Sequence, residues 1–141
     1  MQVGGKTDET GWGVYEESRK GGAIMATAHE HSYSRTHLMS HMENLTVAST
    51  SNHLVLEEDD LGTTVDEGRS FAFVSGLGGR SPRNQDRGGP WWASIYTSDQ
   101  NAEQGALFGE FNVNGNPRLA RFYFKNISGV VVEEFFVQSN L

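Results

Sequence analysis

The chain has 141 residues, a net charge of −7 at pH 7 and no cysteine. The acidic balance argues against a nucleic-acid partner, because such proteins need basic surface to displace counterions from phosphates. The absence of cysteine excludes disulfides and thiolate metal sites. No apolar run reaches the length of a membrane span, and no charged-then-apolar leader opens the chain, which leaves the localisation open, extracellular space included.

Hydrophobic residues make up 36% of the chain, enough for one domain over residues 1–141. A short helix is expected over residues 7–20, with Arg19 and Lys20 at its negative end, as the helix dipole favours. Residues 23–27 are continuously apolar and predict a strand covered on both faces. Residues 28–41 then turn polar and are expected to form a loop at the end of that strand, where a rigid scaffold often carries its chemistry.

Further strands are expected over residues 52–56 and 70–75. The acidic stretch between them, residues 57–60, predicts a solvated turn. A calcium loop is the alternative, but the alternating oxygen ligands of an EF-hand are absent. Residues 91–97 are expected to return as a strand or a short helix. The tryptophan pair that opens this last segment predicts buried packing, with stacking on a sugar or base as the alternative.

Residues 76–90 form a glycine- and arginine-rich segment. Backbone N–H groups of such a loop can cradle a phosphate, with Arg80, Arg83 and Arg87 pairing with it. The segment lacks the lysine and Ser/Thr of a P-loop, however. A structural turn near the site is therefore the favoured interpretation.

The C-terminal third carries the clearest structural pattern. Residues 106–113, 119–126 and 130–137 are rich in Phe, Tyr and Val, and Asn-Gly or Ser-Gly pairs lie in the gaps, as hairpin turns require. This pattern predicts a three-stranded antiparallel meander. The whole chain is therefore expected to be α+β, mainly antiparallel sheet with one N-terminal helix.

The strongest chemical feature is a His-x-His pair. If the segment is extended, period-two alternation places His29, His31, Tyr33 and Arg35 on one side. Two imidazoles so placed can ligate one metal, or one each of two metals, with Tyr33 and Arg35 supporting them or contacting an anion. By chemistry alone, ordinary surface or turn histidines show the same pattern.

Two further histidines follow. His37 and His41 are four residues apart and would share one face of a helical turn. Together with the His-x-His pair they offer a separate site for Cu, Ni or Zn. Polar loop histidines are the simpler interpretation.

The His-x-His segment resembles the last motif of the calcineurin-like metallophosphoesterases and purple acid phosphatases, in which Gly-His-x-His is often followed by x-Tyr-x-Arg. The resemblance covers most of the chain and implies the C-terminal portion of a metallophosphoesterase-type β-sandwich. The other similar segments, in the same order, are residues 1–6, 11–16, 22–24, 73–79 and 91–94.

The resemblance implies metal-dependent hydrolysis of a phosphoester. His29 would bind one ion and His31 the other in a two-metal centre of Zn, Fe or Mn, which clamps phosphoryl oxygens and generates a hydroxide. Ala28 departs from the family's glycine. The earlier Asp-x-His, Gly-Asp and Gly-Asn-His motifs are missing, and with them the family's catalytic residues. Two imidazoles cannot hold such a centre, so the chain alone is expected to be inactive or weakly active.

Three functions therefore stand at the level of sequence. The first is a hydrolase part completed by a missing N-terminal half. The second is a stand-alone metal-binding module that uses His29 and His31, with His37 or His41. The third is a structural, self-associating unit, because half a sandwich would expose strand edges and leave apolar strands such as residues 130–137 without cover.

Overall fold

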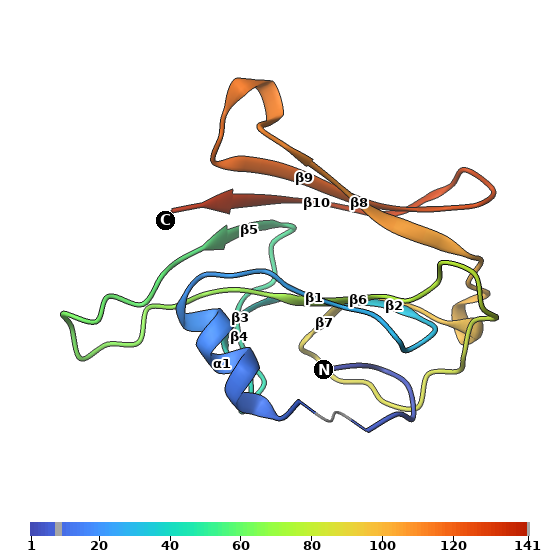
Figure 1. Cartoon of the computed structure of the whole chain (residues 1–141), viewed down its shortest axis with the longest axis horizontal. Coiled ribbons are helices and arrows are strands. Elements are labelled where there is room, and N and C mark those ends of the chain that lie inside the picture. The colour runs from blue at the N-terminus through green and yellow to red at the C-terminus, as the bar shows by residue number, and fades with distance from the viewer. Residues whose placement is uncertain (8–9, 141) are drawn as a thin grey trace.

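The computed structural model describes residues 1–7 and 10–140, and its fold is α+β with mainly strand content (Figure 1). The predicted fold class is confirmed at this level. None of the helices in the described part is long and apolar enough to cross a membrane. The helical elements are α1 (Trp12–Lys20), η1 (Ser98–Gln100) and η2 (Val113–Gly115). The strands are β1 (Met25–Thr27), β2 (Tyr33–Thr36), β3 (Leu38–His41), β4 (Thr46–Ser49), β5 (His53–Leu56), β6 (Ala72–Ser75), β7 (Trp92–Tyr96), β8 (Gly105–Phe111), β9 (Leu119–Asn126) and β10 (Val131–Ser139).

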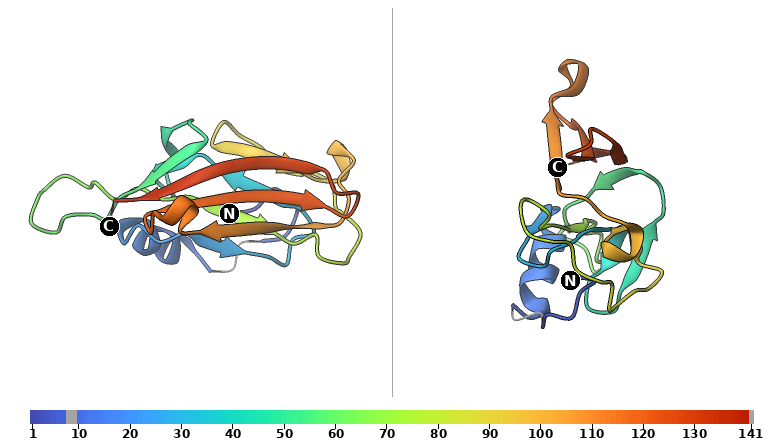
Figure 2. Two further views of the ribbon diagram at one scale, coloured as in Figure 1. Left: turned by 90° about the horizontal axis from the view of Figure 1, so that it is seen from above. Right: turned by 90° about the vertical axis from the view of Figure 1, so that its right-hand side faces the viewer.

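Two four-stranded sheets lie face to face, one in the order β1-β6-β2-β7 and the other in the order β5-β10-β9-β8 (Figures 1 and 2). Strands β3 and β4 form a separate pair, and α1 lies on the side of the first sheet that faces away from the second. Five strand pairings are antiparallel, whereas β1–β6 and β5–β10 are parallel. Both sheets are therefore mixed, although antiparallel pairing predominates as predicted.

The predicted meander is confirmed as β8, β9 and β10, which pair antiparallel in chain order. Its turns use the left-handed conformations that the sequence pattern requires, with Asn114 at φ 54° and Gly129 at φ 84°. The expectation that residues 130–137 would lack cover is wrong. Strand β10 pairs with β9 on one side and β5 on the other, and its Phe135 and Val137 side chains are buried.

The predicted loop over residues 28–41 is wrong beyond residue 32. Strand β2 lies between β6 and β7 inside the first sheet, and all four of its residues are buried. His37 and His41 do not share a helical turn, because β3 begins directly after His37 and ends at His41. The polar composition of these strands led to the prediction of a loop. A polar residue is buried only when a partner elsewhere in the fold satisfies its hydrogen bonds.

The N-terminal helix and first strand are shorter than predicted. Helix α1 begins at Trp12, and residues 8 and 9 of the predicted helix lie outside the described residues. Strand β1 is covered on one face only, with Met25 buried and Ala26 exposed, so the prediction of two covered faces is wrong. The remaining predicted strands, residues 52–56, 70–75 and 91–97, are confirmed as β5, β6 and β7 within two residues at their ends.

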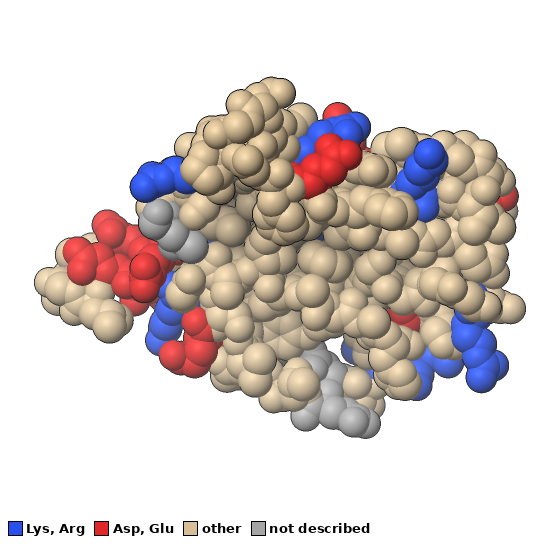
Figure 3. All heavy atoms as spheres, turned by 45° about the horizontal axis from the view of Figure 1, so that its top comes forward, with Lys and Arg blue, Asp and Glu red and all other residues tan. Residues whose placement is uncertain are grey.

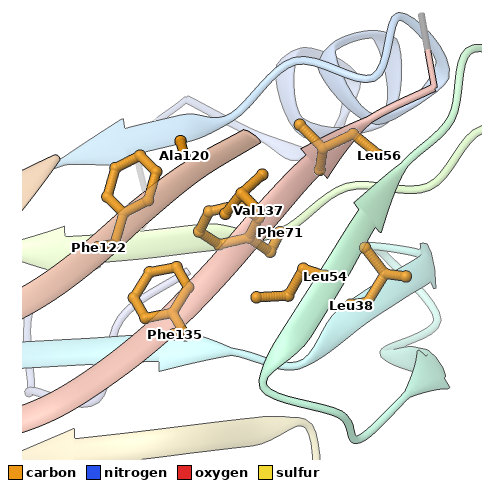
Figure 4. Close-up of a cluster of buried hydrophobic side chains, with 8 residues drawn as sticks. All are labelled: Leu38, Leu54, Leu56, Phe71, Ala120, Phe122, Phe135 and Val137. Atoms are coloured by element: carbon orange, nitrogen blue, oxygen red, sulfur yellow. The ribbon is translucent and has the colours of Figure 1, made fainter. Parts of the chain in front are cut away.

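The largest apolar cluster lies between the two sheets (Figure 4). Phe122 and Phe135 stack with ring centroids 5.2 Å apart, and Phe71 meets Phe135 edge-on at 5.5 Å. Fully burying a side chain of this size contributes about 1.5–3 kcal/mol. This cluster joins the meander to the first sheet through Phe71, which precedes β6, and Phe73 on β6.

The acidic stretch at residues 57–60 belongs to the loop between β5 and β6, as the predicted solvated turn requires. This loop projects from one end of the molecule, where acidic side chains gather (Figure 3). Asp66 in the same loop binds the buried Arg19 of α1 through two contacts of 2.7 and 2.6 Å. The loop is therefore anchored to the helix while most of its other residues face water.

Candidate functional site

His29 lies two residues beyond the end of β1, in a left-handed conformation with φ 74°, which is uncommon for a residue other than glycine. The side chain is exposed, and its Nε2 is 2.5 Å from Nζ of Lys6. A lysine ammonium only donates, so Nε2 accepts this hydrogen bond and carries its lone pair on that side. A lone pair on an exposed imidazole is what a metal ligand requires.

His29 and Lys6 border a hollow of about 410 Å³. The hollow lies where the N-terminal segment, the end of β1 and the start of α1 meet, and strand ends of this kind commonly carry functional residues. A volume of this size is within the range of small-molecule sites. The other polar side chains that line the hollow are Gln2, Thr7, Thr10, Tyr15 and Thr27.

The two histidines of the pair do not share an environment. His29 lines the hollow, whereas His31 is half-buried and does not. The alternation expected from residue 29 to 35 fails because residues 28–32 turn, with the N–H of Ser32 donating to the carbonyl of Glu30 at 2.8 Å, and extended structure begins only at Tyr33. The expectation that His29 and His31 share one side of a strand is therefore wrong. Their role as metal ligands stays a prediction.

Glu30, between these histidines, points into the protein and is 1% exposed. Its Oε2 is 3.5 Å from Nη1 of Arg83, and its Oε1 has no hydrogen-bond partner among the described residues. A buried carboxylate oxygen without a hydrogen bond is costly, so this side chain is a polar feature that core packing alone does not explain.

The glycine-rich segment packs directly against the His-x-His turn. The N–H of Gly76 donates to the carbonyl of Ser32 at 2.9 Å, and a Cβ at Gly76 would lie 1.8 Å from the carbonyl oxygen of Glu30. Only glycine allows this approach. The N–H of Arg83 also donates to the carbonyl of His31 at 2.9 Å. These contacts support the interpretation of a structural turn beside the site.

Tyr33 and Arg35 lie between the sheets and bind one carboxylate, that of Glu133 on β10. The Arg35 guanidinium contacts Oε1 of Glu133 through Nη2 at 2.5 Å and Nε at 2.9 Å, and the Tyr33 hydroxyl donates to Oε2. Burial, together with this carboxylate, raises the pKa of Tyr33 well above its ordinary value. Arg35 is 0% exposed and also lies 4.2 Å from the ring centre of Phe135.

This network joins β2 to β10 and leaves no free donor of Tyr33 facing the hollow. The prediction that Tyr33 and Arg35 support a metal or contact a phosphate stays a prediction, and the geometry favours a structural role instead. Breaking such a buried charge pair destabilises the fold, because the remaining charge is not solvated by water.

The other two candidate histidines lie apart from the hollow. His41 Nδ1 is 2.7 Å from Oε1 of Glu16 on α1. His37 is half-buried, and burial, with a smaller repulsion from Arg35, lowers its pKa. Among the residues that the structure describes, no group of three or more His, Asp or Glu side chains is arranged to hold a metal ion.

Sequence reasoning missed three residues at or near the site. Lys6 is 23 residues from His29, and Glu133 is 98 residues from Arg35, so no local pattern connects them. The sequence around Glu133 does point to a special role, because an acidic residue within an apolar strand requires a buried partner or a solvent-facing position. The sequence around Glu30 gives no such indication, since a charged residue between two histidines usually faces water.

Comparison with known proteins adds no assignment: no family model, curated protein or solved structure matches this chain.

Proposed function

We propose that this chain is the C-terminal part of a metallophosphoesterase-type β-sandwich, whose two layers are the two facing sheets. The proposal is supported by the order of similar segments along the sequence. The single observation that carries it is the His29 imidazole, which borders the hollow beyond β1 and has its Nε2 lone pair turned toward Lys6. A ligand atom at a strand end beside a cavity is a suitable position for a metal.

In this proposal His29 and His31 supply two ligands of a Zn, Fe or Mn centre, and the remaining ligands come from a segment or chain outside the described residues. Such ions, when bound, polarise phosphoryl oxygens and lower the pKa of a coordinated water. The residues of this chain orient and bind. Lys6, whose ammonium lies beside His29 in the lining of the hollow, would attract the phosphoester there.

The metal ligands are tested by titrating the purified chain with Mn²⁺ and recording imidazole signals by NMR. Mn²⁺ is expected to broaden the signals of His29 and His31 at substoichiometric amounts, and His29→Ala is expected to weaken binding by at least about tenfold. His53 is the matched control, because it is exposed on β5 and contacts Gln138 instead. Equal broadening of all five histidines, or none, would contradict the assignment.

The same preparation separates the hydrolase part from a stand-alone metal module. A hydrolase part alone is expected to bind metal weakly and to leave an aryl phosphate intact, because it lacks the full ligand set. Tight one-to-one binding without hydrolysis would instead favour the module. Robust metal-dependent hydrolysis that disappears in His29→Ala would show that the chain is a complete enzyme.

A second candidate, self-association, is supported by β8. Among the described residues, β9 is the only strand that pairs with β8. The other edge of β8 is bonded at its start, where the N–H groups of Gly105 and Leu107 donate to the Leu77 carbonyl and the Ser75 hydroxyl. Beyond these contacts, Phe108 and Phe111 are 47% and 71% exposed. An unpaired, apolar strand edge is a template for pairing with another chain. Light scattering of the pure chain tests this, and Phe111→Lys is expected to reduce any oligomer to monomer. Val14→Lys, an exposed position on α1, is the control. A monomer at high concentration would reject the candidate.

A further inference from the structure

All three tryptophans of the chain border one small pocket. Trp12 opens α1, while Trp91 and Trp92 stand at the start of β7, 79 or more residues further along the chain. The pocket has a volume of about 180 Å³, and Leu45 and Arg87 complete its wall. The three indoles are half-buried, so their remaining surface faces the pocket or the solvent beside it.

We propose that this pocket holds the aromatic ring of an aryl phosphoester whose phosphoryl group lies in the neighbouring hollow at His29. The inference deepens the proposed function and rests on it for the place of the phosphoryl group. The ring site itself is argued from the pocket.

The pocket fits one planar ring in size and chemistry. A cavity of about 150 Å³ is sufficient to hold benzene, and this pocket is slightly larger. Indole faces attract aromatic rings in stacked or edge-on arrangements, which adds to the gain from burying the ring. A ligand with several fused rings would exceed the available volume.

Arg87 gives the pocket a preference for anions. Its side chain is exposed and has no ion pair among the described residues, whereas its backbone N–H donates to the carbonyl of Val3 at 2.9 Å and so holds the residue in place. A guanidinium that is free of carboxylate partners is suited to a phosphoryl or carboxylate oxygen. In a chain with a net charge of −7, an unpaired arginine at an aromatic pocket is a specific local feature.

The tryptophan pocket and the hollow are neighbours. Met1 and Gln2 line both, whereas Lys6 and His29 line only the hollow and the three indoles line only the pocket. A ligand that spans this pair meets the indole rings and Arg87 at one end and Lys6 and His29 at the other. This order matches an aryl group joined to a phosphate, and it excludes alkyl phosphates as preferred ligands, because they leave the indoles without a partner.

The test compares phenylphosphonate, which is not hydrolysed, with methylphosphonate. Binding is followed by tryptophan fluorescence, since every tryptophan borders the pocket, and by ³¹P NMR, which remains usable in tryptophan variants. Phenylphosphonate is expected to quench fluorescence saturably and to bind at least about tenfold more tightly than methylphosphonate. Equal affinities for the two ligands would overturn the inference.

Two variants and one control locate the binding. Trp91→Ala is expected to abolish the preference for the phenyl group, and Arg87→Gln to weaken phenylphosphonate binding about tenfold. Arg80→Gln removes the same charge from an exposed residue outside both linings and is expected to change neither. If Trp91→Ala fails to fold by circular dichroism, Arg87→Gln still decides, and unchanged binding in that variant would also overturn the inference.

Failure of the proposed function has a different signature. Loss of Mn²⁺ broadening at His29 would remove the metal centre, while the preference for phenylphosphonate would persist and support the ring pocket. Conversely, a normal metal response together with equal binding of the two phosphonates would reject only the ring pocket.

Discussion

The two halves of the segment from His29 to Arg35 differ in their exposure to solvent and in what they bind. His29 is exposed beside a hollow and makes one contact with a flexible lysine. Tyr33 and Arg35, the third and fourth members of the same alternating pattern of large polar residues, are fully buried and bound to Glu133. The difference arises at the start of β2, where the chain enters the first sheet and the Tyr33 and Arg35 side chains reach Glu133 of the second.

This difference shows that residue type does not separate a site from a structural network. Both halves carry groups that bind metals or anions. In the buried half, the Tyr33 hydroxyl and the Arg35 guanidinium are already bound to the carboxylate of Glu133 on β10. In the exposed half, the partner of His29 is the Lys6 ammonium, on a side chain that can move. Stability should therefore depend on the buried half and ligand binding on the exposed half.

The largest expected effect is from Glu133→Ala, which leaves Arg35 charged and without its carboxylate in the interior. The free energy of unfolding, measured by urea denaturation, should fall by about 3–5 kcal/mol. Glu134→Ala is the matched control, because that side chain is 41% exposed and its ion pair with Arg121 is screened by water. Equal losses in both variants would show that the Glu133 network does not hold the sheets together.

A smaller loss is expected from Tyr33→Phe, which removes one hydrogen bond to a charged group and keeps the ring against Phe124 at 4.4 Å. The free energy of unfolding should fall by about 1.5–3 kcal/mol. Tyr123→Phe, on the outer face of β9, should be nearly neutral. An effect of Tyr33→Phe no larger than that of Tyr123→Phe would contradict the buried network.

The contribution of the same network to stability should also be measurable at alkaline pH. Folding raises the pKa of Tyr33, so above about pH 10 the unfolded chain loses a proton that the folded chain keeps, and stability declines with rising pH. Urea denaturation at increasing pH should show this decline in the natural chain and a weaker one in Tyr33→Phe. Identical pH profiles would contradict the direction of the shift.

His37, which follows β2, should give a smaller effect on the acid side. Folding lowers the pKa of His37, chiefly through burial. As the pH falls through about 6.5, the unfolded chain therefore binds a proton at this residue that the folded chain does not bind. Stability should drop between about pH 7 and 5, and His37→Gln should reduce that slope. An unchanged slope in His37→Gln would contradict the direction of the shift.

The smallest effect on stability is expected at the proposed ligand. His29→Ala removes an exposed side chain from a left-handed position, and the free energy of unfolding should change by no more than about 0.5 kcal/mol. The same variant should lose the response to Mn²⁺. A large loss of stability would mean that His29 belongs to the structural half of the segment, and the comparison between the two halves would fail.

The sequence by itself determined the α+β class, the end of α1 at Lys20 and the meander, including both ends of β9. These features depend on residues close together in the chain, because alternation sets the strands and glycine or asparagine supplies the left-handed turns. The glycine-rich segment after β6 was also recognisable as a turn, since its composition reports local backbone freedom.

Only the tertiary structure decided that Tyr33 and Arg35 are interior residues, because their burial depends on Glu133, about one hundred positions away. The parallel pairings β1–β6 and β5–β10 and the contact of Lys6 with His29 also join segments that are distant in sequence. A polar residue carries the same local signal whether water or a distant partner satisfies it, so its burial follows from the fold as a whole.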